Sequence, residues 1–458
     1  MYQISRKQLL SRGKGHLTAE DSSSSSSVSP SQSCNQMEGR RSDLEKEWTE
    51  KLQNVNPPEM DEIHMQCIYR VPSNIRNYNP NAYTPQVVSI GPYHHNSFES
   101  MEELKLKYVK GFLNRTRLST KELVAKIEEI ENSNNIRSCY ADPIKCNGDD
   151  FFNMILVDAC FMIELFLRWH ERSDWEGKDP LMLKPWMLLQ IRFDLIRLEN
   201  QLPFTALEHL YNHTAMHPLF PSFRQICFNY LKRTTLRPVC PGENPKHFTE
   251  FVISSIISSS SPRFGLGEQG ECQEVSHLYS VSQLEEAGIK FKVSPNNCIL
   301  DLELSEDGVL SMPILNISSS TQLYFRNMMA YEHCHDSATK IITQYVAILD
   351  FLINTEKDVN ILVDKKIIVN WLGDTDKVVT MISNLNSTVT MPEFCSHYFS
   401  VCNGLNKFYE NPRNKYKAML IHDYLNTPWK IASTVAAIVL LLLTLIQTVC
   451  SIISLVQK

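Results

Sequence analysis

The chain has 458 residues, of which 43% are hydrophobic and 21% are charged. This composition is that of a globular protein and excludes a fibrous or wholly disordered chain, and the length alone allows about three typical domains. The formal net charge of −6 leaves no dominant basic field, which argues against nucleic acid as the main partner.

Residues 1–57 are predicted to form a disordered, Ser-rich tail. A serine run extends from Ser22 to Ser27, and so polar a segment cannot bury the apolar surface that offsets its ordering entropy. The tail also lacks the apolar stretch of a cleaved secretory signal. A short helix over residues 42–53 is the alternative within this tail.

Residues 58–428 are predicted to form a mainly α fold, a helical body with a small antiparallel β-sheet insert. Residues 150–169 are apolar nearly all round, which predicts a central buried helix. Residues 288–315 alternate with period two and supply the predicted sheet, and residues 258–272 read as a flexible Ser/Gly linker. The other predicted helices span residues 99–115, 120–136, 186–199, 203–211, 223–233, 247–257, 321–333, 337–354, 358–365, 374–385 and 394–409.

The segment from Ile431 to Val456 carries no charged residue and is predicted to be a transmembrane helix. About 20 residues cross the hydrocarbon core of a bilayer, so the segment is long enough to span it with some tilt. Trp429 and Lys430 precede it as an interfacial anchor. We expect insertion after synthesis into the plasma membrane or an endomembrane, with the body in the cytosol.

Two further features bear on which side of the membrane holds the body. Thirteen cysteines are scattered along the chain without a Cys-x-x-Cys motif, which favours a reduced body and predicts neither a zinc knuckle nor a thioredoxin-type site. An extracellular body stays the alternative, because four N-x-S/T sequons would then be live glycosylation sites. These sequons begin at Asn114, Asn212, Asn316 and Asn386.

The candidate catalytic residues are three carboxylates, Asp158, Glu164 and Glu199. Asp158 and Glu164 lie in the apolar helix, where burial perturbs carboxyl pKa values as it does in many functional sites. Six positions at about 100° each place these two residues about 120° apart around the axis, so they do not share a face. Structural ion pairing is the favoured interpretation, because Arg168 follows Glu164 by four residues and a second helix offers partners. Those partners are Arg192, Asp194 and Arg197, which precede Glu199 in the sequence.

The chain contains none of the specific catalytic or phosphate-binding signatures, such as a P-loop, G-x-S-x-G or H-E-x-x-H. His94 and His95 are adjacent, and Glu332 with His335 forms one E-x-x-H, but neither pair has further metal ligands at readable spacing. We therefore predict neither a metal site nor a cofactor.

The segment CIYRVPSNIRNYNPNAYTPQVVSIGPYHH, residues 67–95, resembles the opening signature of a plant family called domain of unknown function 247. Later blocks of the family pattern follow in order, and the resemblance covers residues 60–458. The departures are small, with Ala159 where the family usually has Gly and His333 where it often has Gln. Among the later blocks are VDACFMIELF (157–166), LENQLPF (198–204), GVLSMPIL (308–315), RNMMAYE (326–332) and NTPWKIASTVAAIVLLLLTLIQTV (426–449).

The resemblance implies a single-pass, membrane-associated plant protein, and some grass members of this family are similar to determinants of self-incompatibility. No catalytic residue or cofactor follows from it. We therefore expect a membrane-anchored interaction protein in recognition or signalling, with protein or peptide partners. The alternative is a membrane-tethered enzyme that uses Asp158, Glu164 or Glu199. The family-motif positions are Tyr69, Arg70, Val71, Pro72, Gly91, Pro92, Tyr93, His94, His95, Glu199, Asn200, Gln201 and Pro203.

Overall fold

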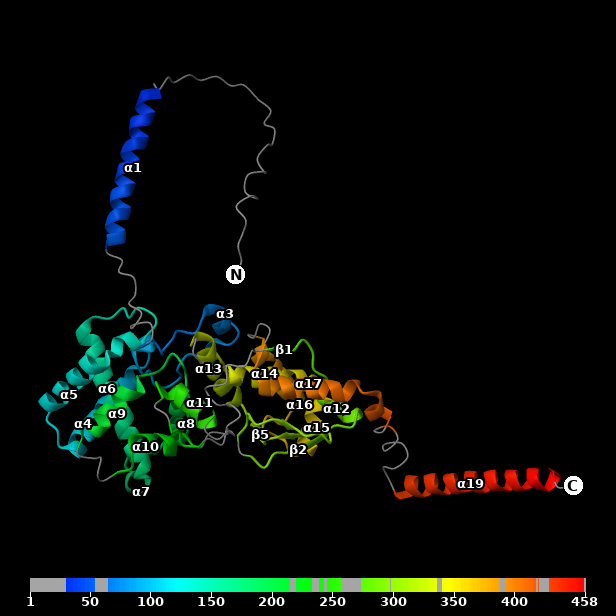
Figure 1. Cartoon of the computed structure of the whole chain (residues 1–458). Helices are drawn as coiled ribbons and strands as arrows, with labels where there is room; N and C mark the ends of the chain where they lie inside the picture. The colour runs from blue at the N-terminus through cyan, green and yellow to red at the C-terminus, as the bar shows by residue number, and fades with distance from the viewer. Residues whose placement is uncertain are drawn as a thin grey trace. The chain divides into compact units, whose positions relative to one another are not determined.

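The computed structural model divides the chain into two units, Met1–Met60 and Asp61–Lys458. In the first unit, helix α1 (Pro30–Gln53) includes the predicted short helix over residues 42–53 but begins at Pro30 (Figure 1). The rest of the predicted tail lies outside the described residues, as does the predicted linker. The structure describes residues 30–53, 65–214, 220–232, 239–242, 245–257, 273–296, 298–335, 340–387, 393–416, 419 and 428–456.

The first half of the body is helical and is organised around α6 (Gly148–His170). The Asn147 side chain accepts from the backbone N–H of Asp150 and caps the start of this helix. Most of its residues from Phe151 to Arg168 are buried, which confirms the predicted central helix. Around α6 lie α4 (Glu99–Thr116), α5 (Thr120–Asn134), α7 (Arg172–Trp175), α8 (Pro185–Asp194), α9 (Phe204–Asn212), α10 (Phe223–Leu231) and α11 (Phe248–Ile257).

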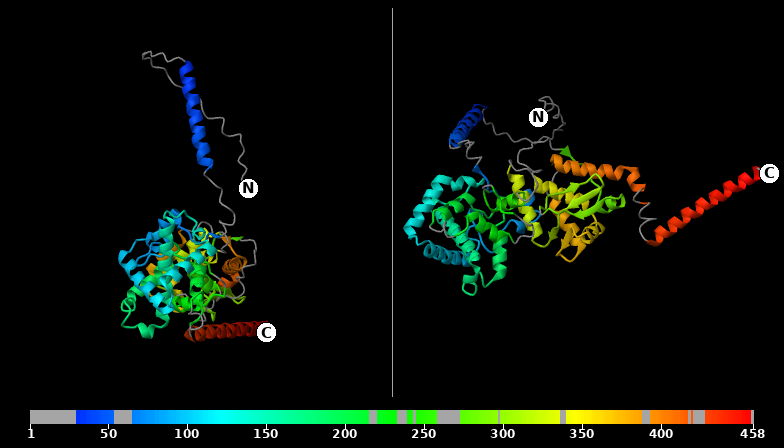
Figure 2. Two further views of the ribbon diagram at one scale, coloured as in Figure 1. Left: turned by 90° about the vertical axis from the view of Figure 1, so that its left-hand side faces the viewer. Right: turned by 60° about the horizontal axis from the view of Figure 1, so that its bottom comes forward.

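The second half combines short strands with helices, and Figures 1 and 2 show it on the opposite side of the body from α4–α10. Its helices α13 and α14 are buried along most of their length, and α13 packs against α11 to join the two halves in one core. The helices are α12 (Val281–Glu286), α13 (Thr321–Cys334), α14 (Ile341–Leu352), α15 (Glu356–Asp364), α16 (Thr375–Asn386) and α17 (Ser396–Glu410).

The predicted mainly helical fold with a small sheet is confirmed, but the pairing of the strands differs from the prediction. In the three-stranded sheet, β3 (Glu303–Leu304) pairs antiparallel with β4 (Val309–Met312), whereas β2 (Lys290–Val293) pairs parallel with β4. The chain after β2 buries Cys298, Leu300 and Leu302 in the core before it turns back, so β2 and β3 are not a hairpin. Two further pairs are β5 (Leu315–Ile317) parallel to β6 (Ile368–Asn370), and β1 (Gln273–Glu274) antiparallel to β7 (Glu393–Phe394).

Helix α19 (Pro428–Val456) is the most apolar long helix among the described residues. Its portion Pro428–Ile453 is long and apolar enough to cross a membrane, and none of that portion is buried. Thr434, Thr444 and Thr448 donate to the backbone carbonyl four residues earlier, so these hydroxyls are satisfied within the helix.

A buried polar network as candidate functional site

The family-motif segment 67–95 contains little regular structure. Its short helices are α3 (Ser73–Arg76), η1 (Pro80–Ala82) and η2 (Pro92–His94), and the residues between them form no ladder of their own. Buried backbone N–H groups need hydrogen-bond partners. Side chains of residues 194–201 supply many of them, together with Asp158 of α6.

The segment 195–203 is irregular, which corrects the predicted helix over 186–199. Helix α8 ends at Asp194, and Leu195 caps it. Asn200 bonds the carbonyl of Asp194 through Nδ2, and Gln201 Nε2 donates to the carbonyls of Leu195 and Arg197. These amide side chains satisfy the end of the helix, so Glu199 lies on a tightly bonded turn rather than on a helix face.

Asp194 and Asn200 hold the extended backbone before Gly91. Asp194 accepts from the N–H groups of Gln86, Val87 and Val88 at 3.0, 2.7 and 2.9 Å. Asn200 Oδ1 accepts from Ile90 N at 2.7 Å, while its Nδ2 donates to the Val88 carbonyl at 3.1 Å. The segment 86–90 is thus bonded to side chains as it would be to a neighbouring strand.

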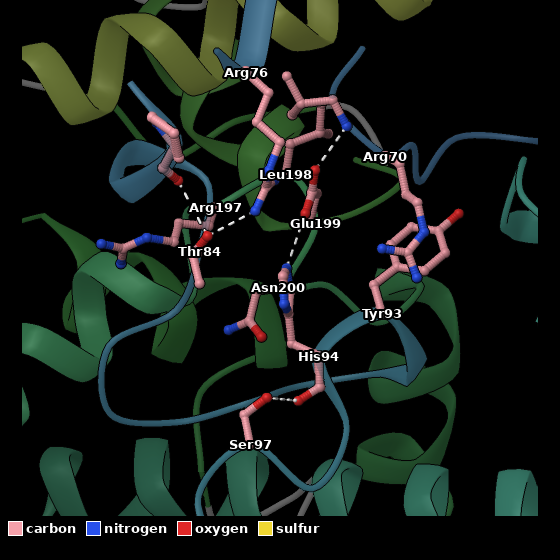
Figure 3. A network of polar contacts seen from close by, with 12 residues as sticks. Arg70, Arg76, Thr84, Tyr93, His94, Ser97, Arg197, Leu198, Glu199 and Asn200 are labelled. Carbon is pink, nitrogen blue, oxygen red and sulfur yellow. Dashed lines mark hydrogen bonds and ion pairs between the residues drawn. The ribbon is translucent and has the colours of Figure 1, made fainter. Parts of the chain in front are cut away.

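Glu199 is the centre of the candidate site (Figure 3). Its Oε1 accepts from Val71 N at 2.8 Å and Arg76 Nη1 at 2.6 Å, and its Oε2 lies 2.9 Å from His94 Nε2. Burial alone would raise the pKa of Glu199, but the bonds from His94, Val71 and Arg76 outweigh it and lower the pKa below its ordinary value. The carboxylate is therefore ionised, and His94 Nε2 is the donor.

The remaining motif residues form the outer side of this network. The Arg70 guanidinium lies 4.4 Å from the centroid of the Tyr93 ring, a cation–π contact. Tyr93 donates to the Ile68 carbonyl, Tyr69 bonds His335, and His95 is exposed at the end of η2. The three motif prolines lie at helix N-termini. Pro72 and Pro203 are the N-cap residues of α3 and α9, and Pro92 is the first residue of η2.

Gly91 joins this network to Asp158. Its φ of +74° and the 2.5 Å that would separate an added Cβ from the Gln201 carbonyl oxygen both require glycine. Gly91 N donates to Asp158 Oδ2 at 2.8 Å. Gln201 in turn accepts from Phe248 N, so the turn is bonded on both sides.

Asp158 forms a buried ion pair with Lys105. The Lys105 ammonium lies 2.6 Å from Asp158 Oδ1, 2.7 Å from Glu102 Oε1 and 2.6 Å from the Ser89 carbonyl oxygen. Burial raises the pKa of Asp158, whereas on Lys105 the bonds to Asp158 and Glu102 outweigh burial and raise the pKa. We take the pair as ionised, because one ammonium contacts two carboxylates.

Glu164 belongs to a separate network. The predicted pair with Arg168 is present at 2.7 Å, and Arg115 Nε adds a second contact at 2.8 Å. Arg168 also binds Asp179 at 2.6 Å and stacks on the rings of Tyr108 and Trp175. In the contacts that the structure gives, Asp158, Glu164 and Glu199 bind different cations and do not converge on one point.

The histidine and E-x-x-H candidates are also engaged elsewhere. His94 binds Glu199. Glu332 accepts from Ile342 N and from the backbone N–H and hydroxyl of Thr343, so the Glu332 carboxylate caps the start of α14. Within the described residues, no group of three or more His, Cys, Asp or Glu side chains has the geometry of a metal site. Sequence reasoning missed Lys105, Arg76, Asp179 and Asn327, because no local pattern separates them from ordinary surface polar residues.

Comparison with known proteins places the chain among plant proteins of unknown function. The Arabidopsis thaliana UPF0481 protein At3g47200 is 28% identical over 417 residues, which cover 85% of this chain and 86% of that protein. The putative UPF0481 protein At3g02645 from the same plant is 22% identical over 506 residues, covering 88% and 94%. No solved structure matches the chain. Because the family DUF247, described as plant protein of unknown function, matches residues 68–443, the resemblance of the motifs is confirmed and the chain belongs to that family.

Proposed function

We propose that this protein is a membrane-anchored interaction protein whose helical body binds a protein or peptide partner in recognition or signalling. The observation that carries the proposal is α19. Its stretch Pro428–Ile453 has a mean hydropathy of 2.5 and is not covered by any described part of the chain. An apolar helix of this length finds its complement in the hydrocarbon core of a bilayer. The corresponding division is a helical domain over residues 58–428 and an anchor over 431–456.

The candidate binding surface is formed by Arg70, Tyr93, His94 and His95, which we call the opening surface. Arg70 and His95 are exposed, and Tyr93 and His94 lie behind them. The bonds of Glu199 to Val71 and His94 hold the backbone of this surface in place. A preorganised surface with an arginine on a tyrosine ring is a typical recognition element, because it loses little entropy on binding.

The second candidate is a membrane-tethered enzyme. Buried carboxyl groups with raised pKa values, Asp158 and Glu332, favour it. Their bonds to Lys105 and to the start of α14 support the structural interpretation instead. We therefore keep the interaction protein as the leading proposal.

A cytosolic body is proposed for the topology. Cys139, Cys146 and Cys240 are free thiols, a state that suits a reducing compartment. Asn386 of the last sequon donates from Nδ2 to Asp350 at 2.7 Å, and a glycan on that nitrogen would displace this partner. Glycosidase treatment of the protein from plant membranes tests the topology. A mobility shift that disappears when all four sequon asparagines are changed to Gln would contradict a cytosolic body.

The anchor is tested by membrane fractionation of the full chain. Leu441→Arg with Leu442→Arg places two charges near the middle of the span, at a cost of about 5–7 kcal/mol for insertion. We expect this variant to leave the membrane fraction, and the matched Leu441→Val, Leu442→Val control to stay there. Retention of the arginine variant after alkaline extraction would refute the anchor.

The interaction is tested by crosslinking on intact membranes. Partners recovered with the wild-type body should be lost with Arg70→Ala combined with His95→Ala. They should be kept with Lys107→Ala, whose exposed side chain pairs with Glu103 on the surface of α4. Equal recovery with both variants would refute the opening surface, and turnover of a small molecule by the same preparation would favour the enzyme.

A further inference from the structure

Two thiols, those of Cys67 and Cys139, lie side by side where the family-motif segment begins. The N–H groups of Cys67 and Ile68 both donate to the Cys139 carbonyl at 2.9 Å, and Ile68 forms a parallel β-bridge with Tyr140. Paired strands lie about 4.8 Å apart, which falls within the Cα separation of about 4.4–6.8 Å that a disulfide requires. The backbone pairing of these two residues is therefore compatible with the Cα spacing of a disulfide.

The surroundings make the two thiols chemically unequal. The hydrogen bond between them lowers the pKa of Cys139 and raises the pKa of Cys67, and the Lys246 ammonium adds to the lowering at Cys139. The thiolate is the nucleophilic form of cysteine. Cys139, which is 8% exposed, is thus the attacking thiol, and Cys67, which is 3% exposed, is its partner.

Lys246 is held in position by a second set of bonds. Its ammonium lies 2.9 Å from His335 Nε2, and His335 Nδ1 lies 2.7 Å from the Tyr69 hydroxyl. The Tyr69 hydroxyl donates to the Gln66 carbonyl at 2.9 Å, so His335 Nδ1 is the donor to Tyr69 and Nε2 accepts from Lys246. These bonds through His335 and Tyr69 hold the Lys246 ammonium beside the two thiols.

We propose that Cys67 and Cys139 form a reversible disulfide in response to a hydroperoxide. The Cys139 thiolate attacks one peroxide oxygen, the O–O bond breaks, and the other oxygen leaves and is protonated to water when the peroxide is hydrogen peroxide. Cys67 then attacks the sulfur of the sulfenic acid at Cys139, the S–O bond breaks, and the oxygen leaves as a second water. The two cysteines lose two electrons and two protons, and the peroxide is reduced.

The disulfide would act on the candidate site. Cys67 lies four residues before Val71, whose N–H binds Glu199, and Tyr69, which bonds His335, lies between them. A bond from Cys67 to Cys139 fixes the start of this stretch to η3 (Ile136–Cys139). Oxidation would therefore stiffen the backbone of the opening surface, a property that does not depend on the identity of its partner.

The test uses the full chain in detergent micelles, first reduced and then exposed to graded hydrogen peroxide. After the remaining thiols are alkylated, proteolysis and mass spectrometry should find one linked peptide that contains Cys67 and Cys139 and disappears with dithiothreitol. Cys160, which is fully buried, should stay alkylatable after unfolding. The oxidised protein should melt on the order of 5 °C higher than the reduced protein.

Two variants serve as matched controls. Cys67→Ser should lose the linked peptide and accumulate sulfenic or sulfinic acid at Cys139, whereas Cys146→Ser should behave as wild type. The proposal is overturned if peroxide oxidises Cys146 while Cys67 and Cys139 stay reduced, or if Cys139 in the wild type stops at the sulfinic acid. The linked peptide is measured in the wild type, so the decision does not depend on the folding of Cys67→Ser.

Discussion

Removal of the Lys105 ammonium tests whether Asp158 is a structural or a reacting group. In Lys105→Met the aliphatic chain is kept, but Asp158 Oδ1 loses its cation and the Ser89 carbonyl loses its donor. Lys105 is 0% exposed and Asp158 is 1% exposed, so water does not replace these partners. Breaking a buried pair from one side costs about 3–5 kcal/mol.

The companion variants make the prediction quantitative. Asp158→Asn keeps an oxygen for Gly91 N and leaves Lys105 bonded to Glu102, so we expect a smaller loss of about 1–3 kcal/mol. The double variant should lose less than the sum of the two, with a coupling of about 1–3 kcal/mol, because the orphaned charge is absent. Full chains in detergent would be unfolded with urea and followed by circular dichroism. Additive losses, or a Lys105→Met loss below about 1 kcal/mol, would show that the pair does not stabilise the fold.

Three further predictions concern other parts of the network. Gly91→Ala should destabilise the protein by about 2–4 kcal/mol in urea unfolding, because φ is +74° and the added Cβ would lie 2.5 Å from the Gln201 carbonyl oxygen. A loss below about 1 kcal/mol would contradict this reasoning. Burial raises the pKa of Glu332 from 4.5 to about 7, so the folded state binds this proton more tightly than the unfolded state. The free energy of unfolding should therefore fall by about 3 kcal/mol as pH rises from about 4.5 to about 7. Glu332→Gln should remove this pH dependence, and an unchanged pH dependence would assign it to another group. Asn327→Leu should cost about 2–5 kcal/mol, since Leu198 N and the Ala82 carbonyl lose their partner in the core, and a thermal melt equal to wild type would refute the role of that amide.

Much of the helical architecture follows from local sequence. The apolar stretch 150–169 corresponds to α6. Asn147 caps its start by accepting from the N–H of Asp150, a contact between residues three apart that needs no tertiary structure. The uncharged stretch from Ile431 onward corresponds to most of α19 for the same reason, since apolar length is a property of the segment alone. The family blocks identified the family before any contact was known. These blocks identified the family by sequence pattern alone and did not show the contacts or roles of their residues.

The partners of the motif residues were decided by the tertiary structure. Glu199 binds Val71 across 128 residues of sequence, and Asp158 binds Lys105 across 53. Nothing in local periodicity specifies which distant N–H or ammonium reaches a buried carboxylate, because that depends on how irregular segments are folded back onto α6. The end of α8 at Asp194 has the same cause, since Asn200 and Gln201 satisfy the helix end only when the turn closes.

Strand pairing was decided at the same level. The alternation of residues 288–315 predicts strands, and antiparallel neighbours are the natural expectation for strands that follow closely in sequence. The parallel pairing of β2 with β4 arises because Cys298, Leu300 and Leu302 must enter the core between them. Sequence thus determined most of the helices and the membrane-length helix, because those preferences are local. The tertiary structure decided where α8 ends, how the strands pair and which polar groups meet, because burial leaves each polar group only the partners that the folded chain brings within reach.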